Sequence, residues 1–104
     1  MAFNIVLCDD DEFSRELLHT NLTAVFPQAN IYHAENLLDI WQVKNPDLVI
    51  LDKLLDGENG SEYIGNLPCQ YIVFSGVADT TKGEIRKPNI DELIKRIESI
   101  KNAG

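Results

Sequence analysis

The feature that most constrains the fold is a set of short apolar runs, each of which stops on a polar side chain. Residues 48–51 are continuously apolar and run into Asp52, and residues 71–74 run into Ser75. A third, mostly apolar run near the start of the chain stops at four consecutive acids, residues 9–12. Apolar runs without alternation are typical of parallel strands that helices cover on both faces. The sequence therefore predicts a buried parallel sheet with polar groups at the ends of its strands.

After the first run, the apolar residues change to the spacing of a helix. Asp10 or Asp11 can cap this helix at its start, and Pro27 ends it. We expect one stripe of the helix to face the core, formed by Phe13, Leu17, Leu18, Leu22, Val25 and Phe26.

Further helices are expected between and after the remaining strands. A short second helix, capped by Asn36, carries Leu37, Leu38, Ile40, Trp41 and Val43. About two helical turns fit into residues 61–67. The last helix carries an apolar stripe formed by Ile90, Leu93, Ile94, Ile97 and Ile100, and Asn89 with Glu92 resembles a capping box at its start.

Strands that alternate with helices predict an α/β fold with parallel strands and right-handed crossovers. We expect a doubly wound, flavodoxin-like sheet of about five strands, in which residues 30–34 form a more polar strand near an edge. The length of 104 residues suits a single domain over residues 1–104, because two cores would each bury too little surface.

Composition excludes several functional classes. The net charge of −8 would repel nucleic-acid phosphates. No apolar run is long enough to cross a bilayer, and no signal peptide is recognisable, so we expect a cytoplasmic protein without membrane or nucleic-acid partners. Cys8 and Cys69 are not spaced as metal ligands or as a redox pair, and we expect free thiols.

One crossover is too short for the usual arrangement. Only 11 residues, 76–86, lie between Ser75 and Lys87. A crossover with a helix of about 11 residues, two loops and a strand needs more chain than this. We therefore expect the helix between the fourth and fifth strands to be reduced or missing, and the fifth strand to be a stub at residues 84–86.

The polar groups at the strand ends form a coherent chemical set. In open α/β sheets, ligands bind at the carboxyl ends of the strands, which here carry Asp9, Asp10, Asp52 and Ser75. Lys87 follows the short last strand. Clustered carboxylates suit a hard ion such as Mg²⁺. With Asp9 and Asp10 as metal ligands, Asp52 could act as a nucleophile toward phosphorus, while Lys87 and Ser75 contact the phosphoryl oxygens.

Other phosphate sites fit the sequence poorly. A Rossmann or flavodoxin-type site needs a loop rich in glycine or hydroxyl groups after the first strand, and this chain has acids there. No P-loop, Cys/His cluster, G-x-S-x-G elbow or H-E-x-x-H motif occurs.

Over essentially its whole length, the sequence resembles a response-regulator receiver domain of two-component signalling. The matching features, in chain order, are Asp9-Asp10, Asp52, Asn59-Gly60, Ser75-Gly76 and Lys87-Pro88 before a terminal amphipathic helix. Each is weak alone, but their order and spacing together are specific.

The resemblance implies a set of roles and partners. Asp52 would be the phosphoacceptor, Asp9, Asp10 and Asp52 would bind Mg²⁺ together with the backbone carbonyl of Leu54, and Ser75 and Lys87 would contact the phosphoryl group. The donor would be a sensor histidine kinase or a histidine phosphotransfer protein, and the output a changed protein–protein surface. The phosphorylation and dephosphorylation would be self-catalysed, so the chain is not expected to be an enzyme in its own right.

The chain also departs from this family. The family's fourth helix belongs to its switching and dimer surface, so the usual dimer is not expected here. Glu84 stands where an aromatic switch residue is common, and Asp56 stands where proline is common. Signalling by aromatic rearrangement is therefore not expected.

Two alternatives remain open. The first is a pseudo-receiver, a binding module that works without phosphorylation; the intact set of acids, Ser75 and Lys87 argues against it. The second is a metal-dependent phosphohydrolase with an aspartate nucleophile. Such enzymes typically carry a second aspartate two residues after the first, and this chain has Leu54 there.

Overall fold

The structure is a computed structural model that describes residues 3–55, 58–59, 65 and 67–103. The expected helix over residues 61–67 lies mostly outside the described residues, as do Asp56 and Gly60. Among the described helices, none is long and apolar enough to cross a membrane.

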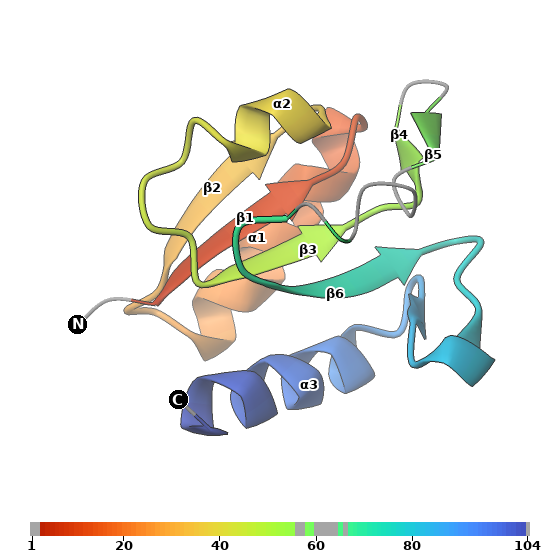
Figure 1. Ribbon diagram of the computed structural model, residues 1–104. Helices are drawn as coiled ribbons and strands as arrows, with labels where there is room; N and C mark the ends of the chain where they lie inside the picture. The colour runs from red at the N-terminus through yellow and green to blue at the C-terminus, as the bar shows by residue number, and fades with distance from the viewer. Residues whose placement is uncertain (1–2, 56–57, 60–64, 66, 104) are drawn as a thin grey trace.

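Five of the described strands form a parallel sheet in the order β2-β1-β3-β6-β7 (Figure 1). Their bounds are β1 Asn4–Cys8, β2 Asn30–Ala34, β3 Leu48–Leu51, β6 Gln70–Ser75 and β7 Ile85–Arg86. The central strand β3 pairs with β1 on one side and with β6 on the other. The predicted α/β fold with a doubly wound parallel sheet is confirmed.

Helices cover both faces of this sheet. The described helices are α1 (Glu12–Val25), α2 (Leu37–Ile40) and α3 (Ile90–Ala103). Figure 1 shows α1 and α3 on one face and α2 on the other. Two strands of two residues each, β4 (Leu54–Leu55) and β5 (Glu58–Asn59), form a separate antiparallel pair after β3.

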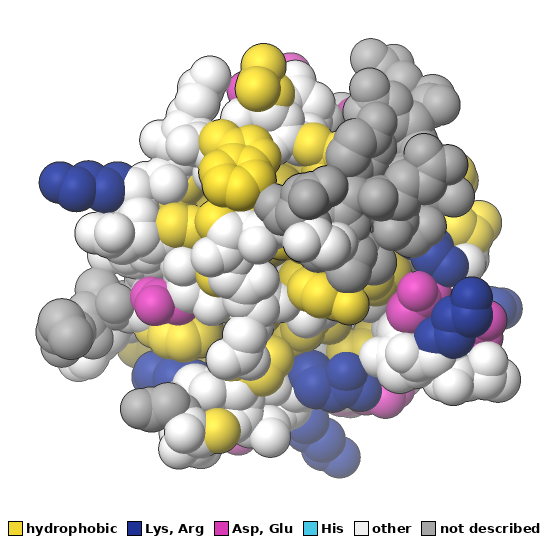
Figure 2. Space-filling model, in the orientation of Figure 1, with side chains coloured by type: hydrophobic (Ala, Val, Ile, Leu, Met, Phe, Trp, Pro, Cys, Tyr) yellow, Lys and Arg dark blue, Asp and Glu magenta, His cyan; other side chains and the backbone are white. Residues whose placement is uncertain are grey.

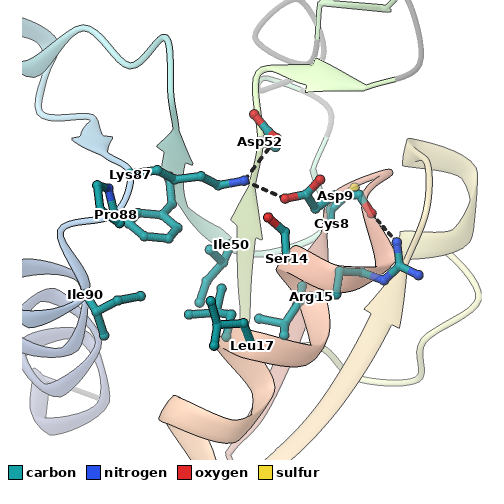
Figure 3. Close-up of a pocket in the computed structure, with 13 residues that line it drawn as sticks. Cys8, Asp9, Ser14, Arg15, Leu17, Ile50, Asp52, Lys87, Pro88 and Ile90 are labelled. Atoms are coloured by element: carbon teal, nitrogen blue, oxygen red, sulfur yellow. Dashed lines mark hydrogen bonds and ion pairs between the residues drawn. The ribbon is translucent and has the colours of Figure 1, made fainter.

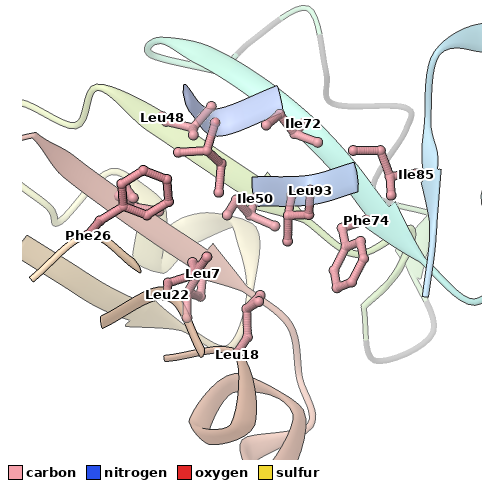
Figure 4. Close-up of a cluster of buried hydrophobic side chains, with 12 residues drawn as sticks. Leu7, Leu18, Leu22, Phe26, Leu48, Ile50, Ile72, Phe74, Ile85 and Leu93 are labelled. Atoms are coloured by element: carbon pink, nitrogen blue, oxygen red, sulfur yellow. The ribbon is translucent and has the colours of Figure 1, made fainter. Parts of the chain in front are cut away.

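Each face of the sheet has its own core. On the α1–α3 face, Leu18, Leu22, Leu93 and Ile97 pack against buried strand residues such as Ile50 (Figure 4). On the other face, α2 contributes Ile40 to a smaller cluster with Val6, Cys8, Ala34, Val49, Leu51 and Leu55. The predicted stripe of α3 is confirmed, since all of its members lie in or against the larger core.

The stripe expected on α1 is only partly right. Leu18 and Leu22 are buried, but Phe13 and Leu17 are 72% and 55% exposed. The third buried position on this face of α1 belongs to Arg15. Because residues 15, 18 and 22 follow the helical spacing of three and four, their line faces the sheet and residues 13 and 17 lie on its flank.

The expected helix caps are present. Asp11 caps α1, with its carboxylate accepting a hydrogen bond from the Phe13 amide at 3.1 Å. Asn36 caps α2, which ends at Ile40, earlier than expected, and leaves Trp41 exposed.

The connection between β6 and β7 contains no α-helix, and all of its residues, 76–84, are described. Its helical content is one 3₁₀ turn, η2 (Thr80–Lys82), which Asp79 caps. The strand that follows, β7, has two residues and is parallel to β6. Both the missing helix and the shortened last strand were predicted from the length of this connection.

Candidate functional site

The candidate site lies at the carboxyl ends of the strands. Asp9 follows β1, Asp52 follows β3, Ser75 ends β6, and Lys87 follows β7. In Figure 3 the side chains of Asp9, Asp52 and Lys87 point toward one another above the end of β3. The parallel sheet brings together residues that are up to 78 positions apart in the sequence.

Lys87 lies between two carboxylates. Its Nζ donates to Asp9 Oδ2 at 2.6 Å and to Asp52 Oδ2 at 3.2 Å. Its backbone amide also donates to the carbonyl of Ser75 at 3.1 Å, which fixes the start of the side chain against β6. The ammonium group is therefore held where it offsets the repulsion between the two acids.

Ser75 contacts the other oxygen of Asp52. Its Oγ donates to Asp52 Oδ1 at 2.6 Å, and the same hydroxyl accepts a hydrogen bond from the Val77 amide at 3.3 Å. Ser75 is fully buried, so its hydroxyl has little freedom to turn elsewhere. The carboxylate of Asp52 thus has a hydroxyl donor on one oxygen and an ammonium donor on the other.

The acids also fit a divalent cation. Asp9, Asp10 and Asp52 each offer a carboxylate oxygen, and these oxygens lie within 4.8 Å of one another. A hard ion such as Mg²⁺ prefers oxygen ligands of this type and keeps several waters. Asp10 is exposed and Asp52 is half-buried, so the cluster is open to solvent on one side.

The amide of Leu54 also faces Asp52. It donates to Asp52 Oδ1 at 3.3 Å. The role expected for its carbonyl, as a metal ligand, stays a prediction.

The charges of the site influence one another. Burial raises the pKa of Asp9, and the negative charge of Asp52 adds to this, whereas the hydrogen bonds from Lys87 and the Asp11 amide counteract it. Burial lowers the pKa of Lys87, but its contacts with Asp9 and Asp52 outweigh burial and hold the pKa above its usual value. Lys87 therefore remains a cation. A second cation near Asp9 would favour the ionised form of the Asp9 carboxyl group.

Sequence reasoning missed Arg15, which contacts the backbone of the site residue Asp9. Its guanidinium donates to the backbone carbonyl of Asp9, and its Nε donates to His33 Nδ1 at 3.3 Å. An ion pair with Glu35 at 3.6 Å completes its contacts. Arg15 thereby ties the turn that carries Asp9 to β2. A signal was present in the sequence, namely an arginine in register with the apolar residues Leu18 and Leu22.

A second missed contact is the ion pair between Lys53 and Glu84. The two groups are 2.7 Å apart, and both side chains are largely buried. The Glu84 carboxylate also accepts a hydrogen bond from the Asp79 amide at 2.7 Å. Burial raises the pKa of Glu84, but these two hydrogen bonds outweigh it and hold the pKa below its usual value. Glu84, which stands where receiver domains commonly carry an aromatic residue, thus forms an ionic contact.

Apolar surface surrounds the acids. A cavity of about 120 Å³ reaches from Asp9 and Lys87 down between α1 and α3, where Leu17, Ile50 and Ile90 line it (Figure 3). Leu54 and Val77, which follow Asp52 and Ser75 at a distance of two residues, are 60% and 52% exposed. The site is therefore a polar centre at the opening of an apolar cavity.

No protein-family model and no curated protein sequence matches the chain. Solved structures do match it. The receiver domain of DrrB, activated by BeF₃, aligns with a TM-score of 0.77 at 18% identity, over 98% of this chain and 99% of that one. The chain has the fold of a response-regulator receiver domain.

Two further receiver structures are similar. The response regulator TrrA from Thermotoga maritima, in complex with Mg²⁺ and BeF, has a TM-score of 0.74 at 25% identity, over 94% of this chain and 98% of that one. The MaeR response regulator bound to beryllium trifluoride has a TM-score of 0.66 at 17% identity, over 98% and 99%. The receiver fold therefore extends over nearly the whole chain, with the helix before its last strand reduced to η2.

Proposed function

We propose that the chain is a phosphoacceptor signalling domain that takes a phosphoryl group onto Asp52 in the presence of Mg²⁺. The observation that carries this proposal is the surroundings of one carboxylate. Asp52 has Ser75 Oγ at 2.6 Å, Lys87 Nζ at 3.2 Å and the oxygens of two further aspartates within 4.8 Å. The hydroxyl and the ammonium group can donate hydrogen bonds to a developing aspartyl phosphate, and the two further aspartates can help to hold a metal ion that offsets its charge.

The donor would be a phosphohistidine of a sensor histidine kinase or of a histidine phosphotransfer protein. A carboxylate oxygen of Asp52 attacks the phosphorus, the P–N bond breaks, and its electron pair stays on the imidazole nitrogen. Ser75 and Lys87 already contact the Asp52 carboxylate, so the phosphoryl oxygens would lie within reach of both donors. Mg²⁺ held by Asp9, Asp10 and Asp52 would offset the negative charge that gathers there.

The transfer would be self-catalysed, and the domain would turn over no separate substrate. Its product, an acyl phosphate on the protein, would act by changing the surface that partner proteins contact. The surface that changes would differ from that of most receivers, since residues 76–84 form a short connection instead of a helix.

The test is intact-protein mass after incubation with acetyl phosphate and Mg²⁺. The wild type is expected to gain one phosphate, and Asp52→Ala is expected to gain none. Asp47→Ala is the matched control, because Asp47 lies at the opposite end of the same strand and should leave labelling unchanged. Chelation of Mg²⁺ should also abolish the gain. A folded wild type that takes up no phosphate would favour the phosphorylation-independent binding module.

A further inference from the structure

The strand β6 is longer than its outer neighbour. On its inner side it pairs with β3 along residues 70–73. On its outer side β7 pairs only with its last two residues, Phe74 with Ile85 and Ser75 with Arg86. Over the described residues, no strand continues the sheet beside the first part of β6.

The backbone groups on this open side can be assigned. The Lys87 amide, directly after β7, donates to the Ser75 carbonyl at 3.1 Å, so the backbone groups of Ser75 point toward the β7 side. Because successive residues of a strand point their backbone groups to alternate sides, those of Val73 and Tyr71 point the same way. The amides of Tyr71 and Val73 and the carbonyl of Tyr71 thus face outward beyond the start of β7.

A groove follows this open edge. It has a volume of about 230 Å³ and lies between β6, η2 and α3, where Tyr71, Val73, Lys82 and Arg96 line it. Tyr71 is 41% exposed and Val73 is 4% exposed, so the edge is accessible from solvent at Tyr71. In Figure 2, basic side chains lie below and to the right of the centre, with acidic side chains beside them, over the region that α3 and η2 occupy in Figure 1.

Two of the three charged residues that line the groove are cations, within a protein whose net charge is −8. Lys82 is exposed, and Arg96 donates to the Gly83 carbonyl at 3.0 Å, a contact that leaves its charge in place. Glu84 also lines the groove, but its charge is compensated by Lys53 at 2.7 Å. An occupant of this groove would therefore gain from negative charge.

We propose that the open edge of β6 is a docking site for an extended, acidic segment of a partner protein, which adds a strand to the sheet. Its backbone would pair with Tyr71 and Val73, and its acids would contact Lys82 and Arg96. This is the strand-addition mode of peptide recognition, in which backbone hydrogen bonds supply affinity and side chains supply specificity.

A second copy of the chain fits less well, since a two-fold contact would bring the same cations together and join two proteins of like net charge. Binding at this edge requires no phosphoryl group on Asp52.

The probe is a short, blocked peptide of alternating glutamate and valine, and an uncharged peptide of alternating glutamine and valine serves as its control. Titration of the full chain, followed by NMR, is expected to show saturable binding of the acidic peptide alone. Amide hydrogen exchange at Tyr71 and Val73 should slow at saturation, because both amides would become hydrogen-bonded. Equal binding of the two peptides, or binding that leaves these amides unprotected, would overturn the proposal.

Two pairs of variants separate the backbone from the charge. Tyr71→Pro removes an outward amide, which an edge strand tolerates, and should weaken binding about tenfold or more, whereas Tyr71→Phe should not. Lys82→Glu should weaken binding by roughly tenfold, whereas Lys95→Glu, on an exposed part of α3 outside the groove, should not. The Lys82 pair decides the question even if Tyr71→Pro fails to fold. A concentration-dependent dimer that protects the same two amides would replace the peptide with a second copy as the occupant.

Discussion

The two ends of the sheet differ in how completely they are built. At one end, β1 pairs with β2 along five residues, from Asn4 with Asn30 to Cys8 with Ala34. At the other end, β7 covers only the last two residues of β6, and a 3₁₀ turn stands where a receiver fold would place a helix. The candidate site takes its residues from the ends of β1, β3, β6 and β7, and the short β7 still brings Lys87 to the acids. The difference shows that the arrangement of these side chains depends on where the strands end, and not on how long the last of them is.

The reduced end of the sheet contributes Lys87 to the site. Its amide is hydrogen-bonded to Ser75, and its Nζ contacts Asp9 and Asp52. The two residue pairs between β6 and β7 are enough to place these contacts. The part of β6 that β7 leaves uncovered lies farther from the acids and carries none of the site residues.

The largest effect that we predict concerns the packing of the centre of the sheet and of its reduced end. Ile50 in the central strand and Ile85 in β7 are both buried in the larger core. We expect Ile50→Ala to lower the free energy of unfolding by about 4 kcal/mol and Ile85→Ala by about 2 kcal/mol, since a sheet edge can collapse around a cavity more easily. Urea unfolding measures both. Equal losses would show that the short end is packed as rigidly as the centre.

Much of this architecture follows from local sequence patterns. The runs that became β1, β3 and β6 were recognisable because a strand buried on both faces has no polar positions. The stub at β7 followed from chain length alone. The exposure of Leu17 did not follow from the apolar residues alone, because Arg15, which is in register with Leu18 and Leu22, takes the inner position. That position depends on the Asp9 carbonyl, which only the folded chain brings close.

For the site, the sequence predicted which residues meet but not how they are linked. Parallel strands bring their carboxyl ends to one edge, so the meeting of Asp9, Asp52 and Ser75 followed from topology. The ion pair between Lys53 and Glu84 could not be foreseen. Two charged residues 31 positions apart give no periodic signal, and their contact depends on the path of residues 76–84.

The second prediction concerns the lifetime of the phosphorylated site and rests on the proposed function. The side chains of Leu54 and Val77 are exposed and apolar, so neither side chain can orient a water molecule for attack on phosphorus. We expect slow hydrolysis in the wild type and an acceleration of roughly tenfold in Leu54→Asn. Loss of the phosphate adduct, followed by intact mass, measures the rate. Leu38→Asn, at an exposed leucine on α2, is the control, and an equal acceleration there would contradict the explanation.

The smallest predicted effect tests the ionic contact at the reduced end. The pKa of Glu84 lies below its usual 4.5 in the folded chain, so its charge stabilises the fold above that pH. This stabilisation is lost as the pH falls through the lowered pKa. Glu84→Gln should therefore lower the free energy of unfolding by about 1 kcal/mol near pH 7 and by less near pH 3.

Thermal unfolding at the two pH values checks this prediction. Glu98→Gln is the control, because Glu98 lies on an exposed part of α3. A cost for Glu84→Gln that does not change between the two pH values would mean that shape, and not charge, is what Glu84 supplies.

The short connection from β6 to β7 also has a thermodynamic consequence. A helix in this place would bury apolar side chains, but each of its residues would also give up about 1–2 kcal/mol of backbone conformational entropy on folding. Residues 76–84 avoid much of that loss, and a shorter loop is also less costly to close. The smaller loss of conformational entropy offsets the apolar burial that a helix would have added. A receiver fold can therefore omit this helix, and the two cores around β1 and β3 stabilise it.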